Sequence, residues 1–376
     1  TDSFSSYVRN IKNVCTHEQV SMIGLTSLKR KEVVMSFAQL SMGKQSITQN
    51  GALGYGAMGL TAFYGAPSSD EKAAQILKAA YDAGCRHYDT AEIYKSGNPV
   101  ADNPNDIYNE TVIGKFLKNL SRDSFTVGTK FLPMKWQNKS DYNTVKTALT
   151  NSLNRLGLDY ADIYYSHRVA SLENAKEFAH SAKRLQEEGL IKHIGFSEII
   201  GKWLKECYAI TPIAAVQQEW SLITRSLEDE LLPVCSTLGV TIVAYSPLGR
   251  NLLSGVITEP PNDWRASLPR YSPENLKKNN ELVKEVEAIA TRHNCTAAQL
   301  SLAWLFHKAK EKNVQVLPIP GTTKIENLLS NLGATQISIT PEEMLILEKI
   351  GSKVSGNRAD DGYMQSGIEG HLSKEH

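Results

Sequence analysis

The chain has 376 residues, of which 41% are hydrophobic, so it can bury one large core or two ordinary ones. Its 41 Lys and Arg residues balance 40 Asp and Glu residues, which disfavours a nucleic-acid-binding or membrane-binding surface and favours a small neutral or anionic ligand. No apolar run reaches the length of about 18 residues that a membrane-spanning helix needs.

Cysteine usage is typical of a reducing compartment. Cys15, Cys85, Cys207, Cys235 and Cys295 are odd in number and scattered, and no two of them form a C-x-x-C pair. This pattern argues against a disulfide framework and against a cysteine zinc site. We therefore expect a cytoplasmic protein without a bound metal.

Residues 1–50 differ in composition from the rest of the chain. They contain eight serines, six Lys and Arg residues against three acids, and the basic run at residues 29–31. Such a segment is typical of a targeting remnant, a partner-binding arm or a poorly ordered extension, and we favour the last interpretation. A targeting remnant would instead place the protein in an organelle.

The first motif, GYGAMG, has the spacing G-x-G-x-x-G through Gly54, Gly56 and Gly59. In a Rossmann fold this spacing requires a helix that begins at the last glycine, and an acidic residue about 20 positions later at the end of a second strand. Gly65 and Pro67 prevent such a helix here. We interpret the segment as a first strand and its loop, in which the glycines give backbone clearance.

From residue 51 onward, short apolar runs alternate with amphipathic stretches. The runs predict strands at residues 52–58, 86–91, 125–130, 163–168, 191–197, 214–221, 240–247 and 314–321. The stretches predict helices at residues 71–83, 107–118, 141–156, 172–188, 202–209, 227–238, 276–293 and 297–310. Eight such units favour an α/β fold, a closed (β/α)8 TIM barrel of parallel strands over residues 51–350, with a C-terminal tail at 351–376. The active site is then expected at the carboxyl ends of the strands.

Polar residues stand at three of these strand ends. HYDTAEIY places Asp89 at the end of the second strand and Tyr94 in the loop beyond it, TVGTK ends in Lys130, and YYSHR contains His167. A hydride that reaches a carbonyl carbon leaves charge on the oxygen, so a positioned acid must supply a proton there. This set is chemically complete for carbonyl reduction.

Each of the four residues has a role in that chemistry. Tyr94 would donate the proton, Lys130 would lower the pKa of the tyrosine, and Asp89 would keep the lysine charged. His167 would donate a hydrogen bond to the substrate oxygen as a neutral imidazole. Taken singly, each residue also has an ordinary structural role, such as helix capping or a partly exposed lysine. Their coincidence at adjacent strand ends favours the functional interpretation.

The motifs YDTAEIY, GTK, SHR, GFSE, VQQEWSLITR, YSPLGR, DWRASLPRY and IPGTTKIENLLSN stand in an order and spacing that resemble the aldo-keto reductase family over about residues 51–350. The chain is most similar to its pyridoxal reductase-like and auxin-induced-protein-like branch, which reduces aldehydes. The resemblance implies an NADPH-dependent oxidoreductase that reduces aldehydes or ketones to alcohols by direct hydride transfer. Tyr94 would be the proton donor, and Asp89, Lys130 and His167 would complete a tetrad.

The resemblance also implies a set of NADPH-binding residues. Ser197 and Gln217 would bind the nicotinamide carboxamide, and Tyr245 would stack under the ring. The other expected residues are Ala57 and Met58 at the first loop; Ser246, Leu248 and Arg250 at the pyrophosphate; Arg265, with Arg270 as a substitute, above the cofactor; and Gly321, Thr323, Lys324, Asn327 and Asn331 at the adenosine 2′-phosphate and adenine. Two positions depart from the family pattern, because Glu198 stands where asparagine is frequent and Asn251 where glycine is usual.

An alternative stays open, in which the chain is a nucleotide-sensing regulatory or scaffold subunit similar to the barrel subunits of potassium channels. Glu198 and the N-terminal segment favour it, whereas the complete tetrad favours an enzyme. The expected partner is a small-molecule carbonyl compound rather than nucleic acid or a membrane, and we expect a monomer or a weak homo-oligomer. The aromatic residues Phe63, Tyr64, Phe131, Trp136 and Trp220 either line the mouth, which would suit planar aldehydes, or pack in the core.

Overall fold

The computed structural model describes residues 39–40, 49–50 and 53–375 of the chain. The chain divides into two units, Thr1–Ala38 and Gln39–His376, and all described residues belong to the second. The predicted N-terminal extension, residues 1–50, therefore lies almost entirely outside the described residues. Within it, strands β1 (Gln39–Leu40) and β2 (Gln49–Asn50) pair in antiparallel fashion.

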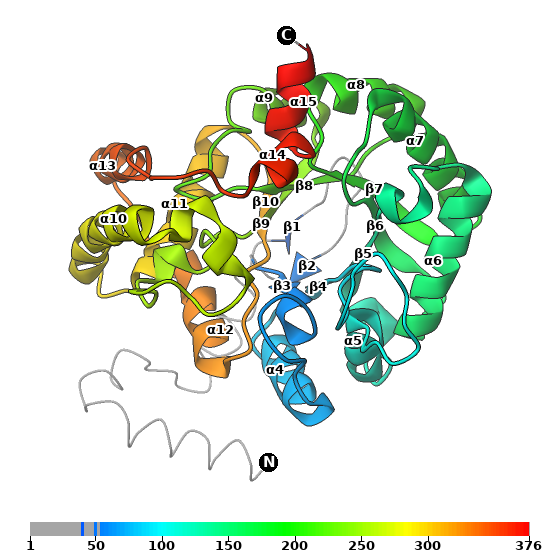
Figure 1. Cartoon of the computed structure of the whole chain (residues 1–376), viewed down its shortest axis with the longest axis horizontal. Coiled ribbons are helices and arrows are strands. Elements are labelled where there is room, and N and C mark those ends of the chain that lie inside the picture. The colour runs from blue at the N-terminus through cyan, green and yellow to red at the C-terminus, as the bar shows by residue number, and fades with distance from the viewer. Residues whose placement is uncertain (1–38, 41–48, 51–52, 376) are drawn as a thin grey trace. The chain divides into compact units, whose positions relative to one another are not determined.

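Eight parallel strands form one sheet that curls around on itself (Figure 1). In chain order the strands are β3 (Tyr55–Gly56), β4 (His87–Asp89), β5 (Thr126–Phe131), β6 (Ala161–Ser166), β7 (Ile191–Ser197), β8 (Ala215–Glu219), β9 (Thr241–Tyr245) and β10 (Val316–Pro318). Each strand pairs with the next one along the chain. The predicted eight-stranded parallel α/β fold is confirmed.

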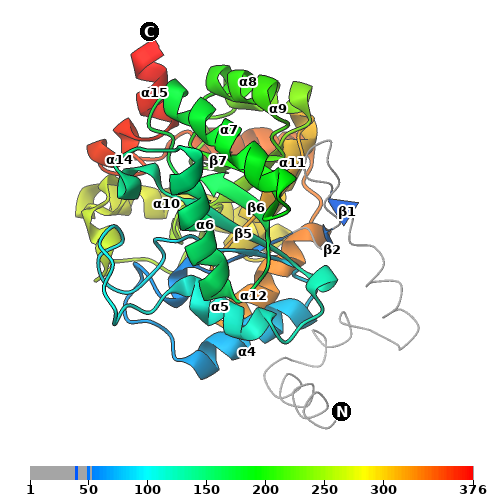
Figure 2. The ribbon, with the colours of Figure 1, turned by 90° about the vertical axis from the view of Figure 1, so that its right-hand side faces the viewer.

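Helices follow the strands and cover the outer face of the sheet (Figures 1 and 2). They are α4 (Asp70–Asp82), α5 (Asn109–Leu117), α6 (Tyr142–Leu156), α7 (Leu172–Glu187), α8 (Gly201–Ile210), α9 (Leu231–Leu238), α10 (Pro273–Arg292), α11 (Ala297–Glu311) and α12 (Ile325–Leu332). Three further helices end the chain, namely α13 (Pro341–Gly351), α14 (Asp361–Gln365) and α15 (Ile368–Glu375). This order places the carboxyl ends of all eight strands on the same side of the sheet.

Helix α4 shows why the amphipathic stretches fold as predicted. It begins after Ser69, whose side chain accepts a hydrogen bond from the Lys72 N–H, and two acids occupy its first turn, where they suit the helix dipole. Its apolar side chains recur at helical spacing and are buried against the sheet: Ala73, Ile76, Leu77 and Ala80. The strand that precedes it is shorter than predicted, because the chain turns at residues 58–60 into a short 3-10 helix.

The first and last strands meet at a contact that we call the seam. The Gly54 N–H donates a 2.9 Å hydrogen bond to Pro318 O, which joins the two edges of the sheet. A Cβ on Gly56 would lie 2.6 Å from Ile319 O, and a Cβ on Gly321 would lie 2.6 Å from Gly56 O. Both glycines are therefore required for the close approach of the two backbones.

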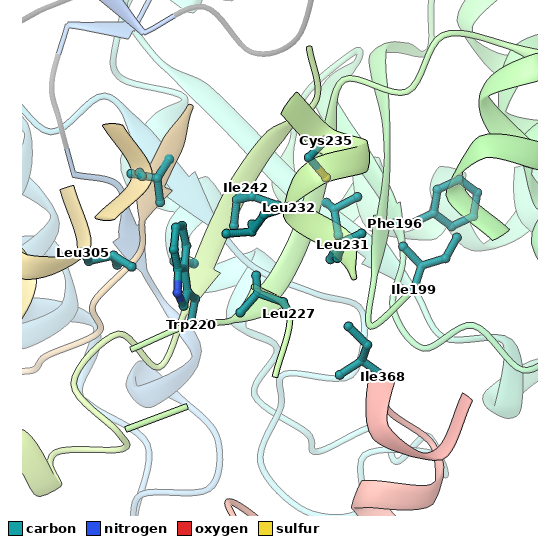
Figure 3. Packing of buried hydrophobic residues seen from close by; sticks show 14 of the residues in the cluster. Phe196, Ile199, Trp220, Leu227, Leu231, Leu232, Cys235, Ile242, Leu305 and Ile368 are labelled. Atoms are coloured by element: carbon teal, nitrogen blue, oxygen red, sulfur yellow. The ribbon is translucent and has the colours of Figure 1, made fainter. Parts of the chain in front are cut away.

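Between the sheet and the helices lies the largest hydrophobic core cluster (Figure 3). Trp220 and Phe131 are completely buried in it, so these two aromatic residues pack in the core and do not line the mouth. In Figure 3, Ile368 of α15 points into the same cluster near Ile199 and Leu227. The C-terminal helix thus contributes to the core of the barrel.

Candidate active site

The four predicted catalytic residues come together at the carboxyl ends of β4, β5 and β6. The Lys130 Nζ donates hydrogen bonds to Asp89 Oδ1 at 2.6 Å and to Tyr94 Oη at 3.5 Å. The ring of His167 stands edge-on to the Tyr94 ring, with 5.6 Å between ring centroids. Gln217 donates from its side-chain amide to the other Asp89 oxygen at 2.7 Å, so both carboxylate oxygens are held.

Burial dominates the electrostatics of this group. Burial raises the pKa of Tyr94 well above its ordinary value near 10, and the charge of Asp89 adds to the rise. The net change in the Tyr94 pKa is thus upward, because burial and the Asp89 charge outweigh the lowering that was expected from Lys130. Tyr94 is therefore a neutral phenol at pH 7 and carries the proton that a donor needs.

The other members of the group respond to burial in the same way. Burial lowers the pKa of Lys130 and raises the pKa of Asp89, while the attraction between the two charges opposes both changes. Burial, with the nearby Lys130 and Arg168 charges, holds the pKa of His167 well below 6.5. His167 is accordingly neutral, as predicted from its expected role.

A cleft of about 560 Å³ opens beside Tyr94 and extends to the first turn of α12. Of the predicted residues, it is lined by Met58, Asp89, Tyr94, Gln217, Tyr245, Ser246, Leu248, Arg250, Arg265, Gly321, Thr323, Lys324 and Asn327. The structure thus places most of the expected cofactor residues along one elongated hollow that begins at the proposed proton donor. The seam forms part of its wall through Gly56, Ile319 and Gly321.

Some predicted residues do not line the cleft. Ala57, Ser197 and Asn331 are buried, with at most 6% of their surface exposed. Ser197 nevertheless lies beside Gln217 in the β7–β8 pairing. Lys130 is completely buried behind Asp89 and Tyr94, which suits a residue that acts through them.

Several lining residues were not predicted from the sequence, and Ser68, Lys72 and Thr322 among them carry polar groups. Tyr64, one of the aromatic residues considered for the mouth, does line the cleft. Lys72 lies in the first turn of α4, whose neighbour is α12, so it comes from the first barrel unit to the same cleft as Lys324 from the last. Its signal in the sequence is weak, because a lysine near a helix start is typical of any surface helix. Tyr64 packs edge-on against Trp264, 5.8 Å between centroids, and links two loops at the cleft.

The structure distinguishes between the two arginines that were candidates to lie above the cofactor. Arg265 lines the cleft and is held by Asp263 through hydrogen bonds of 2.9 and 2.6 Å. Arg270 is instead buried and donates to Ile223 O and to the Thr224 hydroxyl. Arg270 is therefore not available as the substitute that the sequence left open.

Both departures from the family pattern occupy left-handed backbone. Asn251 has φ +81°, a region that glycine adopts freely and asparagine tolerates better than other residues. Glu198 has φ +57° and is completely buried. Glu198 and Asn251 thus adopt the left-handed backbone that asparagine and glycine adopt more readily, and Glu198 adds a carboxylate at its position.

The cleft fits an elongated anionic nucleotide. Glycines at the seam leave room where a Cβ would meet backbone. Arg250 pairs with Glu219 through Nη2 at 3.4 Å, and its buried Nη1 has no hydrogen-bond partner among the described residues, so this nitrogen is free to donate to a ligand. Among the residues that the structure describes, no acidic side chain lies within ion-pair distance of Lys72 or Lys324. Cations that are not neutralised by the protein attract phosphate groups.

Residues 39–40, 49–50 and 53–375 contain neither a cluster of metal-ligating side chains nor a helix suited to cross a membrane. No group of three or more His, Cys, Asp or Glu side chains there is arranged to hold a metal ion. No helix in that part of the chain has both the length and the apolarity to cross a membrane.

Comparison with known proteins agrees with this geometry. The model of the aldo/keto reductase family matches residues 52–352. A probable aldo-keto reductase 1 from Glycine max is 38% identical over 302 residues, which cover 78% of this chain and 83% of that protein.

Solved structures show the same relationship. A thermostable aldo-keto reductase, Tm1743, in complex with the inhibitor epalrestat has a TM-score of 0.65 and 30% identity, covering 84% of this chain and 99% of its own. An aldo/keto reductase from Klebsiella pneumoniae in complex with NADP and acetate has a TM-score of 0.64 and 25% identity, covering 86% and 99%. The chain belongs to the aldo/keto reductase family, whose members are oxidoreductases that use NADP(H).

Proposed function

We propose that the protein reduces aldehydes or ketones to alcohols with NADPH, with Tyr94 as the proton donor. One observation carries the proposal: the Asp89–Lys130–Tyr94 chain of contacts, with His167 against the tyrosine, stands at the inner end of a nucleotide-sized cleft. The same geometry favours an enzyme over a nucleotide-sensing subunit, because sensing does not require a proton donor.

The residues of the site would divide the work as follows. When bound, NADPH supplies the hydride that reduces the carbonyl carbon. Tyr94 holds its proton at Oη and releases it to the carbonyl oxygen, and Lys130 stabilises the phenolate that remains. Asp89, fixed by Gln217, keeps the lysine charged despite its burial, and neutral His167 orients the carbonyl oxygen.

The volume and the lining of the cleft support NADPH rather than a smaller donor. Tyr245 and Gln217 lie at the end near Tyr94 and would receive the nicotinamide. Lys324, Thr323 and Asn327 lie at the loop and helix start after β10, where a 2′-phosphate would meet a cation and backbone N–H groups. Bound NADP in the Klebsiella pneumoniae relative supports the same assignment.

An aldehyde substrate is supported by the loop at residues 95–106, which follows Tyr94 directly. The loop is built around Lys95, whose side chain is completely buried and binds Asp106 and Asp102. Because its charge is neutralised within the loop, this cation does not select an anionic substrate. We infer a small neutral carbonyl compound, with pyridoxal and planar aldehydes as the first candidates.

A reducing compartment such as the cytoplasm suits the cysteines. Cys85, Cys207, Cys235 and Cys295 are free thiols, and three of them are buried. The small-molecule substrate remains the expected partner.

The test is the variant Tyr94→Phe, which removes the proton donor and keeps the ring. We expect kcat to fall by about 100- to 10,000-fold, the usual contribution of a general acid, with NADPH binding nearly unchanged. Loss of NADPH absorbance with an aldehyde panel that includes pyridoxal gives kcat, and quenching of tryptophan fluorescence gives the dissociation constant.

Tyr142→Phe on the outside of α6 is the matched control and should retain full activity. Unimpaired turnover by Tyr94→Phe would contradict the assignment of the proton donor. Tight NADPH binding by the unmodified protein without turnover of any aldehyde would favour the nucleotide-sensing subunit.

A further inference from the structure

The C-terminal segment that follows α13 is tied to the strand ends that form the site. We call Arg358, Tyr363 and Ile368 the C-terminal clamp. The Ile368 side chain is completely buried in the core cluster (Figure 3), and its N–H donates a 3.0 Å hydrogen bond to Glu198 Oε2. The clamp therefore reaches the residue that directly follows β7.

Arg358 is the charged centre of the clamp. Its side chain is 2% exposed and donates to Glu198 at 2.8 and 3.1 Å and to Glu219 at 3.2 Å. It also holds Glu369 of α15 at 2.7 Å. One guanidinium thus joins the ends of β7 and β8 to the last helix of the chain.

These contacts converge on Tyr245 at the end of β9. Its hydroxyl donates to Glu198 Oε1 at 2.6 Å, accepts from Arg358 at 3.0 Å and lies 2.8 Å from the Tyr363 hydroxyl. The Tyr363 ring in turn lies under Arg168, with 3.7 Å from the guanidinium carbon to the ring centroid. Tyr245 is half-buried and lines the cleft, so its hydroxyl end is fixed while another part of the side chain stays accessible.

Burying these charges is costly, and this cost points to a role beyond stability. A buried ion pair is often no better for stability than well-packed apolar residues of the same volume. Glu198 additionally holds left-handed backbone, which is unfavourable for glutamate. Both costs are concentrated around one hydroxyl group at the inner end of the cleft.

We propose that Glu198, Arg358 and Tyr363 are positioning residues that hold the Tyr245 ring at the angle needed to stack on the nicotinamide of NADPH. The inference rests on the proposed function, because it requires the nicotinamide to lie at Tyr245. It assigns to Glu198 a task other than binding the carboxamide, since both of its carboxylate oxygens are already engaged by the clamp and Tyr245.

The test compares two ligands. NADPH contains the nicotinamide, whereas 2′-phospho-ADP-ribose contains the rest of the cofactor without it. In Tyr363→Phe and in Glu198→Gln, we expect the NADPH dissociation constant to rise by about three- to tenfold, as for the loss of one buried hydrogen bond. The dissociation constant of 2′-phospho-ADP-ribose should not change, because this ligand does not reach Tyr245.

A double-mutant cycle tests whether the effect on the NADPH dissociation constant acts through the Tyr245 hydroxyl. Tyr245→Phe keeps the ring and removes the hydroxyl through which the clamp acts. In that background, Tyr363→Phe and Glu198→Gln should add nothing to the NADPH dissociation constant. Additive effects would overturn the proposal.

Ser226→Ala is the matched control, since its hydroxyl binds Glu369 of the same segment at 3.0 Å without touching Tyr245. It should leave both dissociation constants unchanged. Equal weakening of both ligands in Tyr363→Phe and Glu198→Gln, or of neither, would overturn the inference and leave the proposed function standing. Failure of the unmodified protein to bind NADPH would overturn the proposed function and this inference together. If Glu198→Gln does not fold, Tyr363→Phe still decides the question.

Discussion

Glu92 is a completely buried carboxyl group two residues before the proposed proton donor. It accepts hydrogen bonds from the Leu132 N–H at 2.7 Å and from the Trp136 indole at 3.3 Å, and Lys135 lies 3.7 Å away. Burial raises its pKa from 4.5 to about 7. In the folded protein this side chain is therefore mainly protonated below about pH 7.

We expect this preference to appear in the pH dependence of stability. A carboxyl group whose pKa is raised on folding stabilises fully below its ordinary pKa of 4.5, and this stabilisation is lost as the pH rises through about 7. Glu92 should thus lower the free energy of unfolding by about 3 kcal/mol between pH 4.5 and pH 8. Glu92→Gln, which cannot ionise, should lack this decrease.

Urea unfolding at several pH values measures the effect, and Glu71→Gln on the exposed face of α4 serves as the control. Identical pH slopes for Glu92→Gln and the unmodified protein would show that Glu92 does not titrate in this range.

The proposed catalytic group was predictable from single residues, but its electrostatics were not. Asp89, Tyr94, Lys130 and His167 have side chains that form a chemically complete set at strand ends, and this is visible in the sequence. The high pKa of Tyr94 depends on burial, which only the packed structure determines. Lys72 was missed because the sequence does not show whether a lysine at a helix start faces a cleft or open solvent.

At the scale of elements, α5 and α6 approach closely at Gly114. A Cβ on Gly114 would meet the Leu156 carbonyl group, 2.8 Å from its carbon, at the end of α6. We expect Gly114→Ala to destabilise the protein by about 1–3 kcal/mol, because the two helices must separate. The cleft is elsewhere, so NADPH affinity should not change.

Thermal unfolding measures this prediction. Gly157→Ala is the control, since Gly157 ends α6 at φ +66° with open space around it, and only backbone strain of about 1 kcal/mol is expected there. A smaller loss for Gly114→Ala than for Gly157→Ala would contradict the close-approach interpretation.

Element boundaries followed the strength of the local signal. Helix α4 lies within one residue of its predicted limits, because apolar spacing, an N-cap serine and a following glycine agree. Helix α9 begins at Leu231 rather than 227, since residues 227–230 form a turn. Helix α14 has five residues and no buried side chain, so no periodic spacing of hydrophobic residues predicts it.

At the scale of the whole molecule, the seam should be the sensitive point. In Gly56→Ala, the added methyl group would meet Ile319 O and push β3 away from β10. We expect a lower melting temperature and weaker NADPH binding, because the same backbone lines the cleft. Gly59→Ala is the control for stability, as its nearest new neighbour is the Tyr64 ring at 3.7 Å, an ordinary contact. Unchanged stability of Gly56→Ala would refute the role of the seam.

The barrel was predictable because each strand–helix unit has its own local pattern. The clamp was not, because Glu198 and Arg358 are 160 positions apart and nothing in either neighbourhood specifies the other. Contacts of this kind depend on how a finished fold brings remote segments together.

The seam also means that residues from the first and the last strand of the barrel line the same cleft. Closing it requires segments separated by nearly the whole barrel to find each other, so this step carries a large loop-closure entropy and is expected late in folding. Until then β3 and β10 are open edges that can pair with other chains. Because Gly56 and Gly321 both line the cleft, a ligand that fills it would contact both sides of the seam. A ligand that needs both sides of the seam would bind the folded state in preference to the unfolded state, so we expect the stability of the fold to rise with the concentration of that ligand.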